Sequence, residues 1–369
     1  MNILVLCLSP GKGGLELYAF RSSEIVEGFG CKCVTVCRPD SSILDKNSES
    51  DNTSIFSLKV SFHLLPLFAA FRLSRIINQN KINIIHIHWS KDLNVAVFAK
   101  IFSTHNVKLI YTRHMAITRF KNDLYHKFLY CKVDCFVVIT KQLKKEAIKY
   151  LPISESKIKL LYHGINKSGL VIDSNNVSCD QFKITSSSSN YLHIAIFSRI
   201  EEGKGQHLLI EAVHALKIKN KEIHVTVIGH VMDYEYFQNL KTLIKNYQLE
   251  KQFHFHQYIE NASLHMKCFD VIALTTYAET FGLVLIEAMQ SGVAVIGSNA
   301  GGVPEIINDK VTGLLFKSRD VESLTKKIEF YYDNPNLRKE IAIQGQRFVE
   351  VNYSEEQHKK ALHEILKSL

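Results

Sequence analysis

The sequence lacks the cysteine spacing of a zinc or redox site. Its eight cysteines are scattered over 369 residues, and no two of them form a CxxC pair, so we expect neither kind of site. Nothing in their spacing suggests a disulfide framework, and this usage is typical of a reducing compartment. Cys31, Cys33 and Cys37 have the same parity, which places their side chains on one face of a strand and predicts a core position.

Long apolar runs are also missing. No stretch of about 18 apolar residues occurs, so we expect no membrane-spanning helix. The amino-terminal segment MNILVLCLSPGKGG has no positively charged region before a short apolar one, and it predicts a first β-strand rather than a signal peptide. With the cysteine usage, these absences predict a cytoplasmic protein.

Acidic residues are scarce in the first half of the chain. Residues 1–185 contain 25 Lys and Arg against 14 Asp and Glu, a net charge of +11, whereas residues 186–369 contain 20 against 22, a net charge of −2. A basic half predicts an anionic partner, which is nucleic acid, a lipid headgroup or a phosphorylated acceptor. Surface lysine that serves solubility explains the excess equally well. The length of the chain indicates two domains.

Strand and helix patterns alternate along both halves. Strand patterns occur at 2–8, 33–37, 83–88, 107–112, 135–140 and 158–162, and again at 192–197, 223–229, 253–256, 271–275 and 293–296. Helix patterns between them include 15–28, 62–78, 141–150 and 281–290, and two helices are expected to end the chain. This rhythm predicts doubly wound parallel sheets. A stretch rich in Ser and Asn at 174–190 predicts a surface excursion near the domain boundary.

Ligands of such sheets bind beyond the carboxyl ends of the strands. His88, Arg113 and His114 follow predicted strands at such ends, although a purely structural histidine remains an equal alternative for His88. The turn SPGKGG at 9–14 separates the first strand from a helix, and its glycines allow backbone to approach a phosphate. A tight turn explains these glycines about as well, because the segment matches neither the P-loop nor GxGxxG.

Charged residues surround two predicted helix starts in the second half. Arg199 and Lys204 flank a turn that opens a helix, and two such cations suit a doubly charged phosphate group. Glu279 precedes the helix at 281–290, where free backbone N–H groups favour an anionic ligand, and Glu287 lies about two turns further on. Two carboxylates roughly 12 Å apart along a helix suit a polyhydroxylated ligand. The simpler alternative is one dipole-favoured glutamate and one solvated glutamate.

The motifs together resemble those of the retaining glycosyltransferases of family 4, the group 1 family, which have the GT-B fold. The matching segments are GGLE (13–16), HIHW (86–89), TRH (112–114), HGIN (163–166), SRIEEGKG (198–205), ETFGLVLIEAM (279–289) and NAGGVPEII (299–307). The resemblance implies an α/β fold of two Rossmann-like domains that face each other across a cleft. We expect them at residues 1–175 and 176–352, with the helix at 353–369 packing back on the first domain.

The resemblance also implies a role for each matched residue. Arg199 and Lys204 would neutralise the donor diphosphate, Glu287 would bind the ribose and Glu279 would contact the transferred sugar. By the same likeness, Phe281, Gly282 and Leu283 would offer backbone amides, Gly14 would approach the diphosphate from the first domain, and His114 would line the reaction centre. Glu279 and His114 are therefore the catalytic candidates, and His88 and Arg113 are the candidates on the acceptor side.

The implied activity is a metal-independent, retaining transfer of a hexosyl-type sugar from a nucleotide-diphosphate sugar to a glycan or lipid-linked acceptor. Its implied setting is bacterial surface polysaccharide or lipopolysaccharide synthesis, with no metal, no cofactor and no nucleic acid involved. Two alternatives stay open, namely a nucleotide-sugar epimerase of the same fold and a non-catalytic nucleotide- or nucleic-acid-binding protein. His163 and Asn166 stand where the family more often has Asn and Asp, which puts details of the hinge in doubt.

An apolar helix pattern at 62–77 carries Arg72 and Arg75, and Arg119, Lys121 and Lys127 occur elsewhere in the same half. One interpretation is a basic, apolar face that rests on an anionic membrane surface and meets a lipid-linked acceptor there. This would make the protein peripheral on the inner face of the cytoplasmic membrane. The other interpretation is a buried core helix beside a solvated basic surface.

Overall fold

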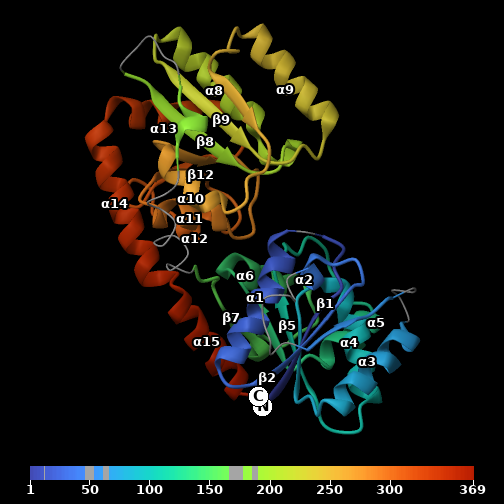
Figure 1. Cartoon of the computed structure of the whole chain (residues 1–369). Helices are drawn as coiled ribbons and strands as arrows, with labels where there is room; N and C mark the ends of the chain where they lie inside the picture. The colour runs from blue at the N-terminus through green and yellow to red at the C-terminus, as the bar shows by residue number, and fades with distance from the viewer. Residues whose placement is uncertain (12, 46–53, 61–65, 166–177, 185–189) are drawn as a thin grey trace. The chain divides into compact units, whose positions relative to one another are not determined.

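The chain forms two compact units in the computed structural model, which describes all residues except 12, 46–53, 61–65, 166–177 and 185–189 (Figure 1). Unit 1 consists of Met1–Tyr162 and His358–Leu369, and unit 2 consists of His163–Gln357. The division lies before residue 175, the boundary expected from the sequence. Most of the segment between these two positions lies outside the described residues.

Unit 1 contains a seven-stranded sheet in the order β3-β2-β1-β4-β5-β6-β7, and all its strand pairs are parallel. Its strands are β1 (Asn2–Cys7), β2 (Lys32–Cys37), β3 (Ser54–Ser57), β4 (Ile84–Ile87), β5 (Lys108–Arg113), β6 (Cys135–Val138) and β7 (Ile158–Leu160). The edge strand β3 has no expected counterpart, because its four residues are short and mostly exposed and carry no buried apolar pattern. The strand order reverses between β1 and β4, which makes this edge the expected ligand side of the sheet.

The helices of unit 1 connect consecutive strands, and the last helix of the chain joins them. They are α1 (Gly14–Gly28), α2 (Ser42–Asp45), α3 (Leu67–Gln79), α4 (Leu93–Phe102), α5 (Leu124–Cys131), α6 (Lys141–Tyr150) and α15 (Glu355–Lys367). Leu362, Ile365 and Leu366 of α15 are buried in the same core as Ile3 of β1 and Ala19 of α1. Burying an aliphatic side chain of this size stabilises a fold by about 1.5–3 kcal/mol, so these three residues hold the end of the chain in unit 1.

Helix α3 differs from its expected extent and is only partly buried. It begins at Leu67, directly after Pro66, and residues 62–65 of the expected helix lie outside the described part of the chain. The side chain of Phe68 is 75% exposed and that of Phe71 is 51% exposed, on the same face as the exposed Arg72 and Arg75. The membrane interpretation requires such a face and stays a prediction. None of the described helices is long and apolar enough to cross a membrane.

Unit 2 contains a six-stranded parallel sheet in the order β10-β9-β8-β11-β12-β13. Its strands are β8 (Leu192–Phe197), β9 (Ile223–Ile228), β10 (Phe253–His256), β11 (Val271–Leu274), β12 (Ala294–Ser298) and β13 (Leu314–Phe316). Its helices are α8 (Gln206–Ile218), α9 (Tyr234–Asn246), α10 (Ala262–His265), α11 (Leu283–Gln290), α12 (Val303–Ile306), α13 (Val321–Asp333) and α14 (Pro335–Asn352). Here the strand order reverses between β8 and β11, which places the segments after these two strands side by side.

Two boundaries in unit 2 depart from the sequence expectations. Helix α11 starts at Leu283 rather than at 281, because Gly282 has a φ of +99° that no regular right-handed helix contains. Three helices, α13 to α15, follow the last strand, where two were expected. Asn334 and Pro335 divide the first two, and Pro335 takes the first position of α14, where its missing N–H costs no helical hydrogen bond.

The cysteines follow one expectation and contradict another. Cys33 and Cys37 are buried in the core of unit 1, as their parity predicts, whereas Cys31 is half-buried. The expectation that no disulfide forms is wrong for Cys179 and Cys268, which are bonded in unit 2 with their Cα atoms 5.5 Å apart. These two residues are separated by 89 positions, so only the fold brings them together and their spacing carries no signal.

Candidate functional site

The centre of the candidate site in unit 2 is an ion pair between two residues 75 positions apart. The Nζ atom of Lys204 lies 3.0 Å from Oε2 of Glu279. Lys204 comes from the segment after β8 and Glu279 from the segment after β11, the two strands at which the sheet order reverses. Their side chains are 18% and 26% exposed, so water still reaches the pair. Lys204 and Glu279 are expected from the sequence to bind one donor molecule, and this requires their side chains to lie close together.

The turn that carries the cations is short and well anchored. It contains a 3-10 helix at Glu202–Lys204, and the hydroxyl of Thr275, at the end of β11, donates a hydrogen bond of 2.7 Å to the carbonyl of Lys204. Arg199 is 58% exposed and its Nη2 lies 2.9 Å from Oε1 of Glu201. An exposed pair of this kind contributes little to stability, so a diphosphate can take the place of the Glu201 carboxylate at low cost.

The glycine pair after β12 positions the backbone of Glu279. Gly301 forms a parallel bridge with Glu279, and the amide of Gly302 donates a hydrogen bond of 2.8 Å to the Glu279 carbonyl. A Cβ atom on Gly301 would lie 2.0 Å from that carbonyl oxygen, and the residue has a φ of +64°. The glycine pair therefore lets this segment approach closely the loop that carries Glu279.

Further contacts fix the rest of that loop. The hydroxyl of Ser298 donates to the carbonyl of Thr276 over 2.7 Å, and the hydroxyl of Ser318 donates to the carbonyl of Tyr277 over the same distance. Ser298 is the last residue of β12, and Ser318 follows the neighbouring strand β13. The loop is thus held by protein groups on several sides, which is the preorganisation that a binding site requires.

The other residues expected to bind the donor lie in helix α11 and in the two positions before it. Phe281 is 3% exposed and packs its ring against His163, with centroids 5.1 Å apart. Gly282 precedes the helix, Leu283 is its first residue, and Glu287 is half-buried on its second turn. The side chain of Phe281 therefore belongs to the core of unit 2. Only its backbone amide is suited to bind the donor, which is the role expected for it.

The glycine turn of unit 1 is closed by a carboxylate from its own helix. Oε2 of Glu16 accepts a hydrogen bond of 2.8 Å from the amide of Gly13, and Glu16 is 5% exposed. A Cβ atom on Gly11 would lie 2.8 Å from the same carboxylate. The Gly13 amide therefore already has a hydrogen-bond partner in Glu16. At Gly14 the side-chain position is open, with no contact within 4 Å of a Cβ atom placed there. Of the glycines in this turn, Gly14 best suits the approach to a ligand expected for it.

Two histidines meet at the carboxyl ends of β4 and β5. Nδ1 of His88 and Nε2 of His114 are 3.2 Å apart, and the ring of Tyr18 from α1 lies edge-on to both. Tyr18 also hydrogen-bonds Nε2 of His358, whose Nδ1 lies 2.6 Å from the carbonyl of Tyr162. Since Nδ1 must carry a proton to donate to a carbonyl, Nε2 of the neutral His358 ring accepts a hydrogen bond from the Tyr18 hydroxyl.

Arg113, expected on the acceptor side, uses its guanidinium to fold the segment that follows it. Its Nε donates to the Met115 carbonyl over 2.7 Å, Nη2 to the Ala116 carbonyl over 2.9 Å, and Nη1 to the Tyr111 hydroxyl over 3.0 Å. Arg113 therefore positions the loop beside His114, and its donors point to protein atoms.

Two family models match the chain, one in each half. Residues 12–168 match the model described as Glycosyltransferase Family 4, and residues 179–348 match the model described as Glycosyl transferases group 1. The chain belongs to this family of glycosyltransferases. It is an enzyme of the GT-B fold, as the motifs predicted.

Relatives and solved structures agree with this assignment. The chain is 24% identical to the capsular polysaccharide biosynthesis glycosyltransferase CapM of Staphylococcus aureus, over 61% of this chain and 59% of CapM. The crystal structure of a glycosyltransferase from Rickettsia africae has a TM-score of 0.87 at 20% identity and covers 100% of this chain and 98% of that one. HepE of Anabaena, solved with UDP-glucose, has a TM-score of 0.81 at 19% identity, with 100% of both chains covered.

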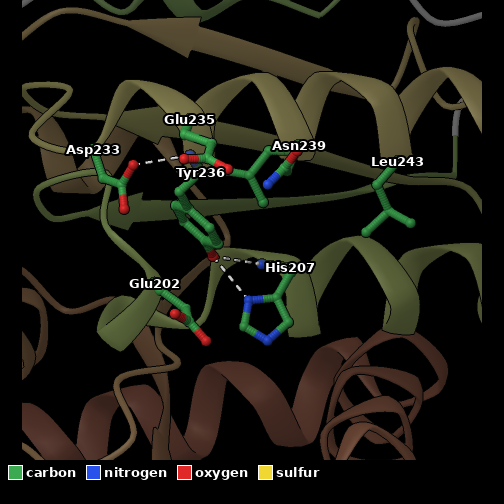
Figure 2. A pocket seen from close by; sticks show the side chains of 8 residues that line it. Glu202, His207, Asp233, Glu235, Tyr236, Asn239 and Leu243 are labelled. Atoms are coloured by element: carbon green, nitrogen blue, oxygen red, sulfur yellow. Dashed lines mark hydrogen bonds between the residues drawn. The ribbon is translucent and has the colours of Figure 1, made fainter.

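A pocket of about 620 Å³ in this glycosyltransferase lies beside the Lys204 turn (Figure 2). Its lining includes the carboxylates of Glu202, Asp233 and Glu235 and no cation, so it does not suit a diphosphate. The Tyr236 hydroxyl at its floor lies 2.8 Å from Nδ1 of His207.

His207 connects this pocket to the Glu279 loop. Its Nε2 lies 3.1 Å from the Tyr277 hydroxyl, and the guanidinium of Arg319 covers the Tyr277 ring at 4.2 Å. Sequence reasoning missed His207, Tyr236 and Tyr277 as parts of the site. Their hydrogen bonds join positions 29 and 70 residues apart, and no local pattern indicates such pairs.

His86 gives unit 1 of the glycosyltransferase a defined dependence on pH. Its ring is fully buried and its Nε2 lies 2.7 Å from the Thr112 hydroxyl. Burial and, to a lesser extent, the charge of the nearby His358 lower the pKa of His86 to about 3. Burial and the neighbouring His86 also lower the pKa of His114, but that ring is partly exposed.

We expect unit 1 to lose stability as the pH falls from about 6.5 towards 3. In this window the unfolded chain binds a proton at His86 that the folded chain does not, and the free energy of unfolding falls by up to about 1.4 kcal/mol per pH unit. The expected result is that His86→Asn weakens the fall in urea midpoint between pH 7 and pH 5. An equal fall in both proteins would contradict this prediction.

Proposed function

We propose that this glycosyltransferase is a retaining, metal-independent enzyme that moves a hexose from a nucleotide-diphosphate sugar to a glycan or lipid-linked acceptor of surface polysaccharide synthesis. The observation that carries the proposal is the 3.0 Å ion pair of Lys204 and Glu279 at the point where the sheet order of unit 2 reverses. A cation beside a carboxylate offers one group for a diphosphate and another for sugar hydroxyls, and Arg199 lies in the same segment after β8 as Lys204.

The donor fits the chemistry of unit 2. The diphosphate binds Arg199 and Lys204, and the backbone amides at the start of α11 add partial positive charge. The Lys204–Glu279 pair then serves both ends of the scissile bond, because the ammonium faces the phosphate and the carboxylate faces the hexose. Glu287 on α11 binds the ribose. The HepE complex with UDP-glucose supports a uridine nucleotide as the first donor to test.

The reaction proceeds on one face of the sugar. The bond between the anomeric carbon and the phosphate oxygen breaks, and the oxygen keeps the electron pair. The acceptor hydroxyl forms its new bond to carbon on the same face, and its proton passes to the departing phosphate oxygen. Arg199 and Lys204 stabilise the charge on that phosphate, and such preorganised cations take the role that a metal ion has in other enzymes.

Unit 1 holds the acceptor in this proposal. His114 and His88 lie at the carboxyl ends of neighbouring strands with their rings in contact, and these ends are where parallel sheets bind ligands. Burial keeps the His114 ring neutral at physiological pH by lowering its pKa to about 3. A neutral imidazole can hydrogen-bond an acceptor hydroxyl without adding positive charge to the acceptor site.

A thermal-shift panel of UDP-, GDP- and ADP-sugars tests the proposal. A correct donor at 100 times its Kd stabilises the folded protein by about 2.7 kcal/mol, which corresponds to a rise in Tm of roughly 5–10 °C for a domain of this size. Slow release of the free nucleotide with retained configuration of the sugar is expected for the same donor. No shift with any nucleotide sugar would contradict the proposal, and epimerised donor without an acceptor would favour an epimerase instead.

A further inference from the structure

The segment after β5 is irregular in backbone but firmly held in unit 1. Beyond its contacts with Arg113, the amide of Ile117 donates to Oε2 of Glu146 over 2.8 Å. The amide of Lys121 donates to the Tyr150 carbonyl over 2.9 Å, and the Phe120 and Tyr150 rings are edge-on with centroids 5.0 Å apart. Since α6 carries Glu146 and Tyr150, this segment is docked on a regular element, and its side chains are presented in fixed positions.

The outer surface of this segment combines apolar and cationic side chains. Met115 is 57% exposed, Phe120 is 62% exposed and Leu124 is 85% exposed. Arg119 is exposed between them, and Lys121 is half-buried. Large apolar side chains that gather on an exposed surface mark a contact with a ligand, a partner or a membrane more often than a free surface does.

Lys121 is the residue of this surface that most needs an anion. Within the described ranges, its ammonium makes no hydrogen bond and no ion pair, and neither does Arg119. Asp123 is the nearest acid in sequence, but its carboxylate binds the backbone and the ring of His126 over 3.0 and 2.5 Å. Burial lowers the pKa of Lys121, and the charges of Arg113 and Arg119 lower it further, whereas the charge of Asp123 raises it.

A half-buried cation beside two guanidinium groups is costly unless an opposite charge joins it. A phosphate group meets this requirement better than a carboxylate, because it has more acceptor oxygens and more charge. The exposed apolar side chains around Lys121 suit an aliphatic chain next to such a group. The excess of cations in the first half of the chain also favours the binding of a phosphate group, because it attracts anions over a longer range.

We propose that Lys121, together with Arg119, binds a phosphate group attached to the aliphatic part of the acceptor, while Phe120 and Leu124 contact that aliphatic part. The acceptor is then a phosphorylated amphiphile rather than a free neutral glycan. This inference rests on the proposed function, in which unit 1 holds the acceptor, and it adds the chemical class. The phosphate can belong to a single acceptor molecule or to headgroups of a bilayer, and the experiment separates these sources.

The test measures binding of monomeric decyl phosphate to the full-length protein by calorimetry, with decyl glucoside as the neutral probe. Lys121→Met is expected to weaken the binding of decyl phosphate about tenfold or more, as the loss of one charged hydrogen bond does. Lys121→Arg should restore most of it. The matched control is Lys360→Met, which removes the same charge from an exposed position on helix α15 of the same unit and should change binding less than about twofold.

Sedimentation with phosphatidylglycerol vesicles and with phosphatidylcholine vesicles identifies the source of the phosphate. Weaker binding of Lys121→Met to decyl phosphate alone indicates the acceptor's own phosphate, and weaker binding to phosphatidylglycerol as well indicates headgroups. Equal losses in Lys121→Met and Lys360→Met, or tight binding of decyl phosphate by Lys121→Met, would overturn the inference. The thermal shift by a nucleotide sugar should be the same in all variants, so failure of the anion site is distinguishable from failure of the donor assignment.

Discussion

Lys204→Ala is expected to lower the rate of sugar transfer by about 10²- to 10³-fold, the usual loss when one group that stabilises transition-state charge is removed. The ammonium lies 3.0 Å from Glu279, and in the proposed reaction it faces the phosphate on which negative charge grows. The loss should fall mainly on kcat, because the charge on the departing oxygen is larger in the transition state than in the bound donor. Transfer rates at saturating donor and acceptor measure this effect.

The fold should tolerate this change. The substitution leaves the Glu279 carboxylate without its cation, but the side chain is 26% exposed and water can solvate it, so the cost in stability is about 1 kcal/mol. Lys326→Ala is the matched control, since it removes an exposed lysine that pairs with Glu322 on the surface of the same unit. We expect this control to transfer sugar at the normal rate. Near-normal transfer by Lys204→Ala would refute the role given to the ion pair.

The sequence predicts the sheets of both units well for a physical reason. Strands such as Leu192–Phe197 and Val271–Leu274 are buried runs between polar turns, and the structure has them within one residue of the expected bounds. Burial on both faces of a parallel sheet leaves this continuous apolar signal. Strand β13 (Leu314–Phe316) has only three residues at the edge of its sheet, too few for such a pattern, and it was missed for that reason.

The meeting of Lys204 and Glu279 was predicted from the family resemblance and not from periodicity. Each residue follows a strand, but only the order β8-β11 makes these strands neighbours, and single-sequence patterns carry no strand order. The role of Arg113 was assigned by position at a strand end. The structure shows that its guanidinium folds the next loop, because backbone carbonyls of an irregular segment need donors.

The role of the glycine turn of unit 1 also could not be decided from the sequence alone. Its sequence is compatible with a phosphate cradle or with a tight turn. The Glu16 carboxylate accepts the hydrogen bond of the Gly13 amide. Since one N–H group makes one strong hydrogen bond, this amide serves the tight turn and not a phosphate. The fourth residue of the motif GGLE thus closes the turn. Gly14 stays a candidate for the donor, because no protein atom lies within 4 Å of its Cβ position.

Gly301→Ala is expected to lower sugar transfer about 100-fold or more, because the added methyl group displaces the backbone of Glu279. The added Cβ would lie 2.0 Å from the carbonyl oxygen of Glu279, well inside van der Waals contact, and the φ of +64° is unfavourable for alanine. The loop must move by 1 Å or more to accept the methyl group. Displacements of about 1 Å at a reacting centre cost on the order of 10²-fold in rate.

Gly203→Ala separates this effect from a general loss of loop glycine. Gly203 lies in the turn that carries Lys204, and its Cβ position has no atom within 4 Å, so alanine there should leave transfer within about threefold of normal. For Gly301→Ala we expect a loss in kcat that exceeds the change in donor Kd, because the Glu279 carboxylate moves while Arg199 and Lys204 stay in place. Normal transfer by Gly301→Ala would show that the position of the Glu279 backbone has no influence on the reaction, and a global loss of folding would appear as a lost thermal transition.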